Sequence, residues 1–268
     1  MSNRQPADEG GLALWFNPPG DEPAGRRVLT RDRVVAEALV IIAADGAQAL
    51  SMRALAARLG VVPGALYRHV RGKEQLLDFV LDAVLGEVDR RTGADDHWAV
   101  RVAALADRLR AVLENHPGTA ALLKTRDPLS PTSLTLAEAF LAALHAAGLP
   151  GREAALAFRL IYDYTLGFAL SDPTSPGEQR IQDTATRAEL HAFLRSLPAD
   201  RFPALAAVGA YAWADDRDQR FTASLDTLIA GLRATLRPRT RDASQPAQAG
   251  PARSARPDGR PRTSPPLP

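Results

Sequence analysis

Apolar residues recur every three or four positions through most of the chain between residues 30 and 237, and prolines or glycines interrupt the pattern at intervals. This spacing places apolar side chains on one face of an α-helix, whereas a half-buried strand needs strict alternation. Alternating runs of β-branched residues are absent from the sequence. We therefore predict an all-α fold.

Capping residues divide the first part of this pattern into three short helices. Thr30 is suited to cap the first helix and Ser51 the second, and Gly60 suits the left-handed position that ends the second. Pro63 fits the first turn of a third helix, because its missing N–H would have no partner there. We expect this third helix to run to about Val70, so that the last two helices form a helix-turn-helix.

A longer helix is expected to begin at Lys73, after Gly72, and further helical segments follow it. The segment from Asp172 to Thr186 is polar and contains Pro, Gly and Ser, and is predicted to be a loop. The further helices are expected at about 95–115, 118–125, 132–147, 151–171, 187–196, 203–214 and 219–237.

Composition narrows the class of protein. The chain has 268 residues, of which 46% are hydrophobic and 24% charged, which is enough to build one or two globular domains. It contains no cysteine, so a disulfide framework, a thiol nucleophile and a Cys-ligated metal are excluded. No apolar run approaches the roughly 18 residues of a membrane span, and the N-terminus lacks the pattern of a signal peptide. We expect a cytoplasmic protein without a membrane partner.

The two ends of the chain differ from the middle. Residues 1–29 are rich in Gly, Pro and acidic residues, and residues 238–268 contain eight of the 21 prolines and almost no large apolar residue. Such segments bury too little apolar surface to offset the loss of chain entropy. We predict that both tails are disordered.

A basic segment lies between Ser51 and Lys73. It carries five of the chain's 33 Lys and Arg residues and no acidic residue, although the formal net charge of the whole chain is only +2. The predicted third helix presents Ala65, Arg68 and His69 on its outer side, with Tyr67 at the flank. This helix face begins with a small residue and continues with cationic ones, which suits the major groove of DNA. The alternative is a solvated helical hairpin with incidental arginines, because the chain has 31 Arg and two Lys.

Taken together, these residues resemble the N-terminal domain of the TetR family of transcriptional regulators. The resemblance spans some 45 residues, and its most specific element is Leu66-Tyr67-Arg68-His69-Val70 followed by Lys73. Weaker resemblance to the C-terminal domain of the tetracycline-repressor subgroup continues at His116-Pro117, Gly148 and Tyr164 to Phe168. It implies a helix-turn-helix DNA-binding domain at 30–75 and a helical ligand-binding and dimerisation domain at 76–237.

The resemblance also implies which residues contact DNA. Tyr67, His69, Lys73 and Ser51 are expected to bind phosphates, and two arginines to read bases, because arginine can grip guanine with two hydrogen bonds. Pro63 and Gly64 offer no side-chain donors where many relatives carry polar residues, so base reading would rest on fewer groups. The expected DNA-binding set is Ser51, Arg53, Pro63, Gly64, Ala65, Tyr67, Arg68, His69 and Lys73.

The effector end departs from the tetracycline-binding members. The two histidines that bind magnesium and drug in those members fall on or near Leu123 and Asp89 here, so a magnesium–tetracycline chelate is not expected. We instead predict an apolar pocket, although each of its aromatic residues could equally belong to the core. We predict no metal site, no cofactor and no catalytic residue. The expected ligand-binding set is Leu105, Leu109, His116, Leu123, Phe140, Phe158 and Tyr162.

The predicted function is a ligand-responsive regulator: a repressor that binds a palindromic operator in double-stranded DNA as a homodimer and is released by a small, largely apolar effector. The dimer interface is expected from the helices at 151–171 and 219–237, whose apolar stripes a monomeric core would also explain. Three other readings remain open at this stage. They are an activator or dual regulator of the same fold, a helical enzyme or carrier with an appended DNA-binding module, and a non-specific DNA-coating protein.

Overall fold

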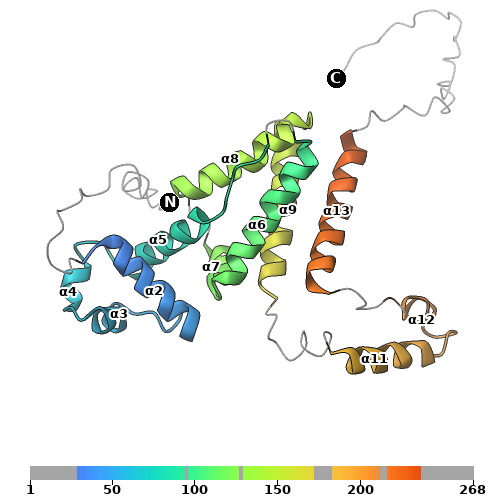
Figure 1. The fold of residues 1–268 in the computed structure, drawn as a ribbon, viewed down its shortest axis with the longest axis horizontal. Helices are drawn as coiled ribbons and strands as arrows, with labels where there is room; N and C mark the ends of the chain where they lie inside the picture. The colour runs from blue at the N-terminus through green and yellow to red at the C-terminus, as the bar shows by residue number, and fades with distance from the viewer. Residues whose placement is uncertain are drawn as a thin grey trace, which may run out of the picture. The chain divides into compact units, whose positions relative to one another are not determined.

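Helices provide all the regular structure in the part of the chain that this computed structural model describes (Figure 1), namely residues 29–93, 96–126, 129–171, 183–209, 211 and 216–236. The all-α prediction is therefore confirmed. None of these helices is both long and apolar enough to cross a membrane. The two tails predicted to be disordered lie outside the described residues, apart from Leu29. The helices are α2 Arg31–Asp45, α3 Met52–Leu59, α4 Pro63–Leu66, α5 Lys73–Gly86, α6 Trp98–Asn115, α7 Thr119–Thr125, α8 Pro131–Ala146, α9 Gly151–Ala169, α11 Thr184–Ser196, α12 Pro203–Val208 and α13 Arg217–Leu236.

The first helices begin and end where their capping residues predict. The hydroxyl of Thr30 accepts a hydrogen bond from the backbone N–H of Arg33 at 3.2 Å, and that of Ser51 accepts one from Ala54 at 3.1 Å. Gly60 ends α3 with a φ of +69°, a left-handed conformation that glycine adopts at little steric cost. Ser51 and Gly60 therefore determine the two ends of α3, and Gly60 also determines where the turn begins.

The third helix is shorter than predicted. We expected it to continue to about Val70, but α4 ends at Leu66 and residues 67–69 form a turn. The N–H of His69 bonds to the carbonyl of Leu66, three residues back, at 2.9 Å. This tighter turn lets the side chain of Val70 point into the core, where it is 2% exposed, and leads the chain through Gly72 into α5.

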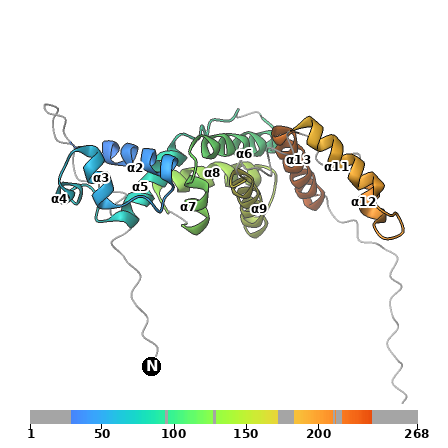
Figure 2. The same cartoon turned by 90° about the horizontal axis from the view of Figure 1, so that it is seen from below.

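Helix α5 connects α2, α3 and α4 with the rest of the chain (Figures 1 and 2). It contacts α2 as well as α6, α7 and α8. Leu76, Val80 and Val84 are completely buried, and the buried residues of both regions form one continuous hydrophobic cluster. The division between residues 75 and 76 falls inside α5 and stays a prediction.

Helices α6, α8 and α9 pack against one another and form the body of the second region. Helix α13 packs on α6 and α9. The ring of Phe221 stacks on Tyr164 at 5.3 Å between centroids and meets Phe168 edge-on at 5.1 Å, and the Tyr164 hydroxyl donates to the Phe221 carbonyl at 3.0 Å. Ala157 and Ile161, on one of the two helices expected to form the dimer interface, are buried within the single chain.

Two buried arginines complete this packing. Arg110 of α6 bonds to Asp218 at 2.7 Å and to Asp107 at 3.1 Å, and Arg217 bonds to Glu114 at 3.0 Å. Each guanidinium also lies over an aromatic ring, Arg110 over Phe221 at 4.7 Å and Arg217 over Phe168 at 4.5 Å. The start of α13 is therefore held by charge as well as by apolar contact.

Helices α11 and α12 pack on each other. The first begins at Thr184, earlier than the expected 187, because Asp183 caps it by accepting a hydrogen bond from the N–H of Thr186 at 2.7 Å. The second ends at Val208, short of the expected 214, and residues 210 and 212–215 lie outside the described part of the chain.

Gly118 supplies a stability test of the contact between α2 and α7. Its φ is +86°, and a Cβ there would lie 3.2 Å from Cγ2 of Ile42, whereas Gly148 has the same φ and nothing within 4 Å. Gly148→Ala should lower the free energy of unfolding by about 1–2 kcal/mol through backbone strain alone. Gly118→Ala should cost about 1 kcal/mol more through overpacking. Urea unfolding of the two variants measures the difference, and equal losses would contradict the predicted role of Ile42.

Candidate nucleic-acid interface

The expected DNA-binding residues lie together on α3, the turn, α4 and the start of α5. They fall within 23 consecutive residues, so they lie on elements that follow one another directly in the chain. Tyr67 is 55% exposed and Val62, in the turn, is 71% exposed. The exposed members are Ser51, Arg53, Pro63, Gly64, Tyr67 and Arg68, and the partly buried members are Ala65, His69 and Lys73.

The arginines of the basic segment divide into two groups. Arg58 forms an ion pair with Glu37 of α2, so its charge is already matched inside the protein. Arg53 and Arg68 form no ion pair within the described residues, and both are exposed. Arg71 is likewise exposed and without an ion pair in the described part of the chain, so the two arginines expected to read bases are among three that remain available to a ligand.

Sequence reasoning missed Arg31. It is the first residue of α2, and its guanidinium lies 4.6 Å from the ring centroid of Phe79. Its positive charge also lowers the pKa of His69. Its Nε atom is buried and has no hydrogen-bond partner among the described residues.

The surroundings of His69 favour the neutral form of its imidazole. Partial burial lowers its pKa from the usual 6.5, and the positive charges of Arg31 and Arg68 lower it further. A neutral imidazole can still donate one hydrogen bond to a phosphate oxygen. Protonation would add a third positive charge to this cluster.

Lys73 opens α5, and the backbone N–H groups of its first turn receive no side-chain cap. The preceding N–H, that of Arg71, instead bonds to the side chain of Gln75 at 2.7 Å. The positive end of a 14-residue helix and the ammonium of Lys73 are thus presented at the same place. This combination favours an anion such as a DNA phosphate.

The acidic face of α5 anchors it to the second region. Arg126, just after α7, donates to Asp78 at 2.7 Å and 3.1 Å and forms an ion pair with Glu74. Asp82, one turn farther, accepts from the backbone N–H of Thr132 at the start of α8 at 3.2 Å. Contacts to two other elements therefore follow one stripe of α5.

The expected ligand-binding residues lie mainly in the packed core. Leu105, Leu109 and Phe140 are at most 1% exposed, and Leu123 is 5% exposed. Phe158 is partly buried and lies 5.8 Å from Phe140 and 5.7 Å from Tyr162 between ring centroids, so the structure brings these three rings into one row.

His116 stands apart from this row. Its Nε2 lies 2.9 Å from Glu87 just beyond the end of α5, and its carbonyl accepts from the Thr119 hydroxyl at 2.6 Å. The polar residue expected in the pocket thus joins α6 to α5.

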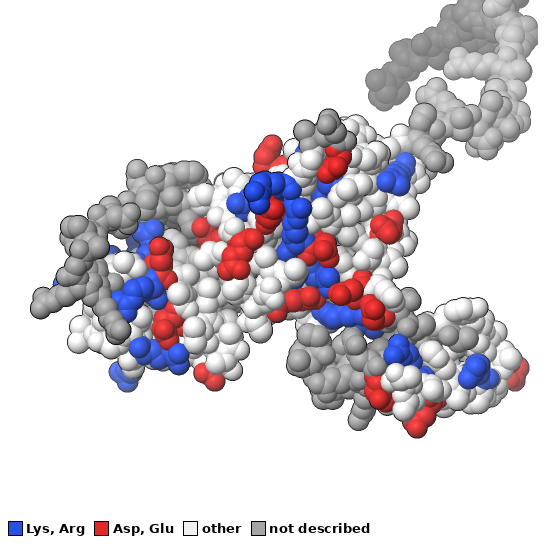
Figure 3. All heavy atoms as spheres, viewed as in Figure 1, with Lys and Arg blue, Asp and Glu red and all other residues white. Residues whose placement is uncertain are grey.

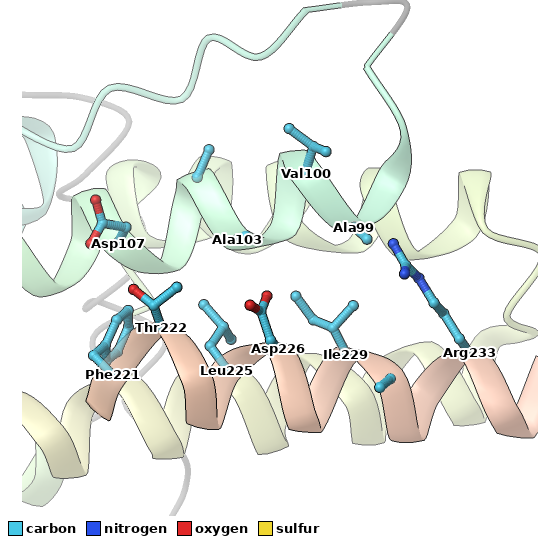
Figure 4. Close-up of a pocket in the computed structure, with 12 residues that line it drawn as sticks. Ala99, Val100, Ala103, Asp107, Phe221, Thr222, Leu225, Asp226, Ile229 and Arg233 are labelled. Atoms are coloured by element: carbon cyan, nitrogen blue, oxygen red, sulfur yellow. The ribbon is translucent and has the colours of Figure 1, made fainter. Parts of the chain in front are cut away.

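A groove of about 720 Å³ runs between α6 and α13 (Figure 4). None of the expected ligand-binding residues lines it. Within the described ranges, no cluster of three or more His, Cys, Asp or Glu side chains could hold a metal ion. Figure 3 shows basic and acidic side chains mixed over α6 to α9, so neither sign dominates that face.

Two family models match the chain. Residues 34–80 match the model described as bacterial regulatory proteins, tetR family, and residues 92–236 match the tetracyclin repressor-like C-terminal domain. The chain belongs to the TetR family. The matches follow the helix-turn-helix and the second helical region described above, and they confirm the resemblance found in the sequence.

Relatives of this TetR-family regulator carry related names. It is 36% identical over 225 residues to an HTH-type transcriptional regulator of Saccharopolyspora erythraea, covering 83% of this chain and 92% of the relative. It is 30% identical to the HTH-type transcriptional repressor DrrR1 of Streptomyces coeruleorubidus, over 84% of this chain and 87% of the relative. The chain therefore belongs to a family of transcriptional regulators and is not an enzyme.

Solved structures agree with this assignment. Apo ActR from Streptomyces coelicolor superposes with a TM-score of 0.68 at 34% identity, covering 79% of this chain and 98% of that one. ActR in complex with actinorhodin gives a TM-score of 0.67 at 35% identity, covering 78% and 99%. The helix-turn-helix domain followed by a C-terminal helical domain is thus confirmed.

The lowered pKa of His69 predicts how acid affects this TetR-family regulator. Because folding lowers this pKa, the unfolded chain binds the proton more tightly, and stability falls as the pH drops through about 6.5. His69→Gln should therefore reduce the drop in Tm between pH 7.5 and pH 5.5. His191→Gln, outside the DNA-binding region, is the control. An unchanged drop in the His69 variant would contradict the assigned burial and charge effects.

Proposed function

We propose that this TetR-family regulator is a cytoplasmic repressor that binds a palindromic operator as a homodimer and leaves it when a small, largely apolar effector binds the C-terminal domain. The observation that carries the proposal is the position of α5. Its first residue, Lys73, belongs to the expected DNA-binding set, and its acidic stripe is bonded to Arg126 and Thr132 of the second region. A change in the effector domain can therefore reach the DNA-binding helices through one rigid element.

The DNA-binding role proposed for each residue combines the family resemblance with its exposure and charge. We assign Arg53 and Arg68 to bases, because the resemblance places DNA contacts at both positions and both are exposed without an ion pair within the described residues. Ser51, Tyr67, His69 and Lys73 are assigned to phosphates. Pro63, Gly64 and Ala65 allow the backbone of α4 to approach the base edges closely.

The homodimer rests on family membership and on one surface. Leu156 and Leu160 lie one turn apart on α9 and are 56% and 45% exposed. Large apolar side chains at this spacing form a stripe that a second copy can cover. Two copies are also needed to present two recognition elements about 34–36 Å apart, in successive major grooves.

Release by an effector is supported by the relatives. Several of them, including DrrR1, are named as repressors, and ActR has been solved in complex with actinorhodin. A ligand that prefers one of two arrangements by a few kcal/mol is sufficient to shift the population. The aromatic row Phe140, Phe158 and Tyr162, with Leu105, Leu109, Leu123 and His116 around it, remains the proposed lining of the apolar pocket.

Enrichment of random duplexes with the full chain, followed by footprinting, tests the DNA-binding part. One protected palindrome is expected. Lys73→Ala should weaken all duplexes alike and lower the salt slope by about 1, whereas Arg68→Ala should cost about 1–3 kcal/mol and relax base preference. Arg58→Ala, whose charge is paired with Glu37, is the matched control. Uniform protection of all duplexes, or only monomer in sedimentation, would contradict the proposal.

Arg126→Gln tests the connection through α5. The variant loses the ion pairs to Glu74 and Asp78, so the N-terminal turns of α5 should exchange their amide hydrogens at least several-fold faster. Operator affinity should fall about tenfold, within the usual range of coupling between sites. Arg159→Gln, which breaks an exposed pair with Asp163 on α9, should change neither quantity. Wild-type exchange and affinity in the Arg126 variant would refute the proposed connection.

A further inference from the structure

The groove between α6 and α13 has the size and walls of a small-molecule site. This open groove has a volume of about 720 Å³, within the range of about 300–1,000 Å³ typical of ligand sites. On α6 its wall consists mostly of alanines, including Ala99, Ala103 and Ala104, and on α13 Leu225 and Ile229 form the base. Small residues on one side and large apolar residues on the other leave room for a flat ring system.

The charged groups of the groove are separated by sign. Asp226 of α13 projects toward α6 in Figure 4 and, within the part of the chain that the structure describes, forms no ion pair. Asp107 stands on the opposite wall, where it bonds to Arg110 at 3.1 Å. Arg233 lines the other end, with its guanidinium 5.8 Å from the ring centroid of Trp98. Seven residues of helix, or about 10 Å, separate Asp226 from Arg233.

We propose that this groove binds an organic amine, with a flat apolar body on the alanine wall and a protonated amine at Asp226. The unpaired carboxylate supplies a charge-assisted hydrogen bond. The guanidinium of Arg233 repels a cation at the other end, so the amine can occupy only the end near Asp226 and Asp107. A carbonyl or carboxylate at the far end of the ligand could accept from Arg233.

The site would be joined to the DNA-binding helices through α6. One side of this helix forms the groove, and its other side carries Leu105 and Leu109 of the core. At its C-terminal end, His116 lies 2.9 Å from Glu87 at the end of α5. The groove is separate from the apolar pocket proposed above, and the inference rests on the proposed function in one respect: an amine bound here acts as a second effector only if the chain is an effector-controlled regulator.

Dansylcadaverine, a naphthalene ring with a primary amine on a short chain, is a suitable probe. Dansylamide carries the same ring without the amine and is the matched ligand control. With the full-length protein, titration followed by dansyl fluorescence should show one molecule of dansylcadaverine bound per chain. It should bind at least tenfold more tightly than dansylamide.

Three variants separate the groove from other surfaces. Asp226→Asn should weaken dansylcadaverine about tenfold and leave dansylamide unchanged, because only the charge is removed. Ala103→Phe, which fills the groove, should abolish binding of both probes. Glu138→Gln removes an exposed carboxylate on α8 and should change neither. Circular dichroism and Tm confirm that each variant is folded.

The inference is overturned if Asp226→Asn leaves the preference for the amine intact, if binding survives in Ala103→Phe, or if wild-type protein does not bind dansylcadaverine. Operator binding, measured on the same preparation, distinguishes this failure from that of the proposed function. An intact operator complex without amine binding refutes the groove site alone. Amine binding without recognition of any palindrome refutes the repressor and leaves the groove site standing.

Discussion

The packing of α5 into two sets of helices is the constraint on which the rest of the structure depends. Leu76, Val80 and Val84 are fully buried in one cluster that includes residues of α2 on one side and of α6 and α8 on the other. Close-packed side chains have few alternative arrangements, so such a helix moves between discrete positions instead of bending gradually. Under the proposed function, this packing would tie the position of the DNA-binding helices to the state of the effector domain.

The polar contacts of α5 add direction to this packing. Apolar burial is non-directional and would tolerate small rotations of the helix, whereas the fork of Arg126 requires Glu74 and Asp78 on the same face. Ion pairs that are partly exposed contribute little net stability. We therefore attribute the register of α5 against α7 and α8 to these ion pairs. Most of the stability comes from the apolar core.

Local signals in the sequence were sufficient for much of the fold. The Thr30 and Ser51 caps and Gly60 each act within a few residues, so their effects could be predicted without tertiary structure. The early end of α4 could not be predicted in this way, because it depends on the burial of Val70 against other helices. The residues expected to bind DNA belong to one short motif, so the sequence alone was sufficient to group them. The contacts of Arg126 with α5 span about 50 positions of sequence, and the groove between α6 and α13 joins segments more than 100 apart, so neither leaves a local pattern.

The acidic stripe of α5 also limits how the parts of this chain can be recombined. A junction placed at residue 75, between the two predicted domains, would separate Glu74 from Asp78, although both bind the same guanidinium. A chimera that exchanges the DNA-reading helices would have to carry α5 to its end at Gly86 and bring a partner for Arg126 with it. The segment that must be exchanged as a whole is thus longer than the helix-turn-helix by one helix.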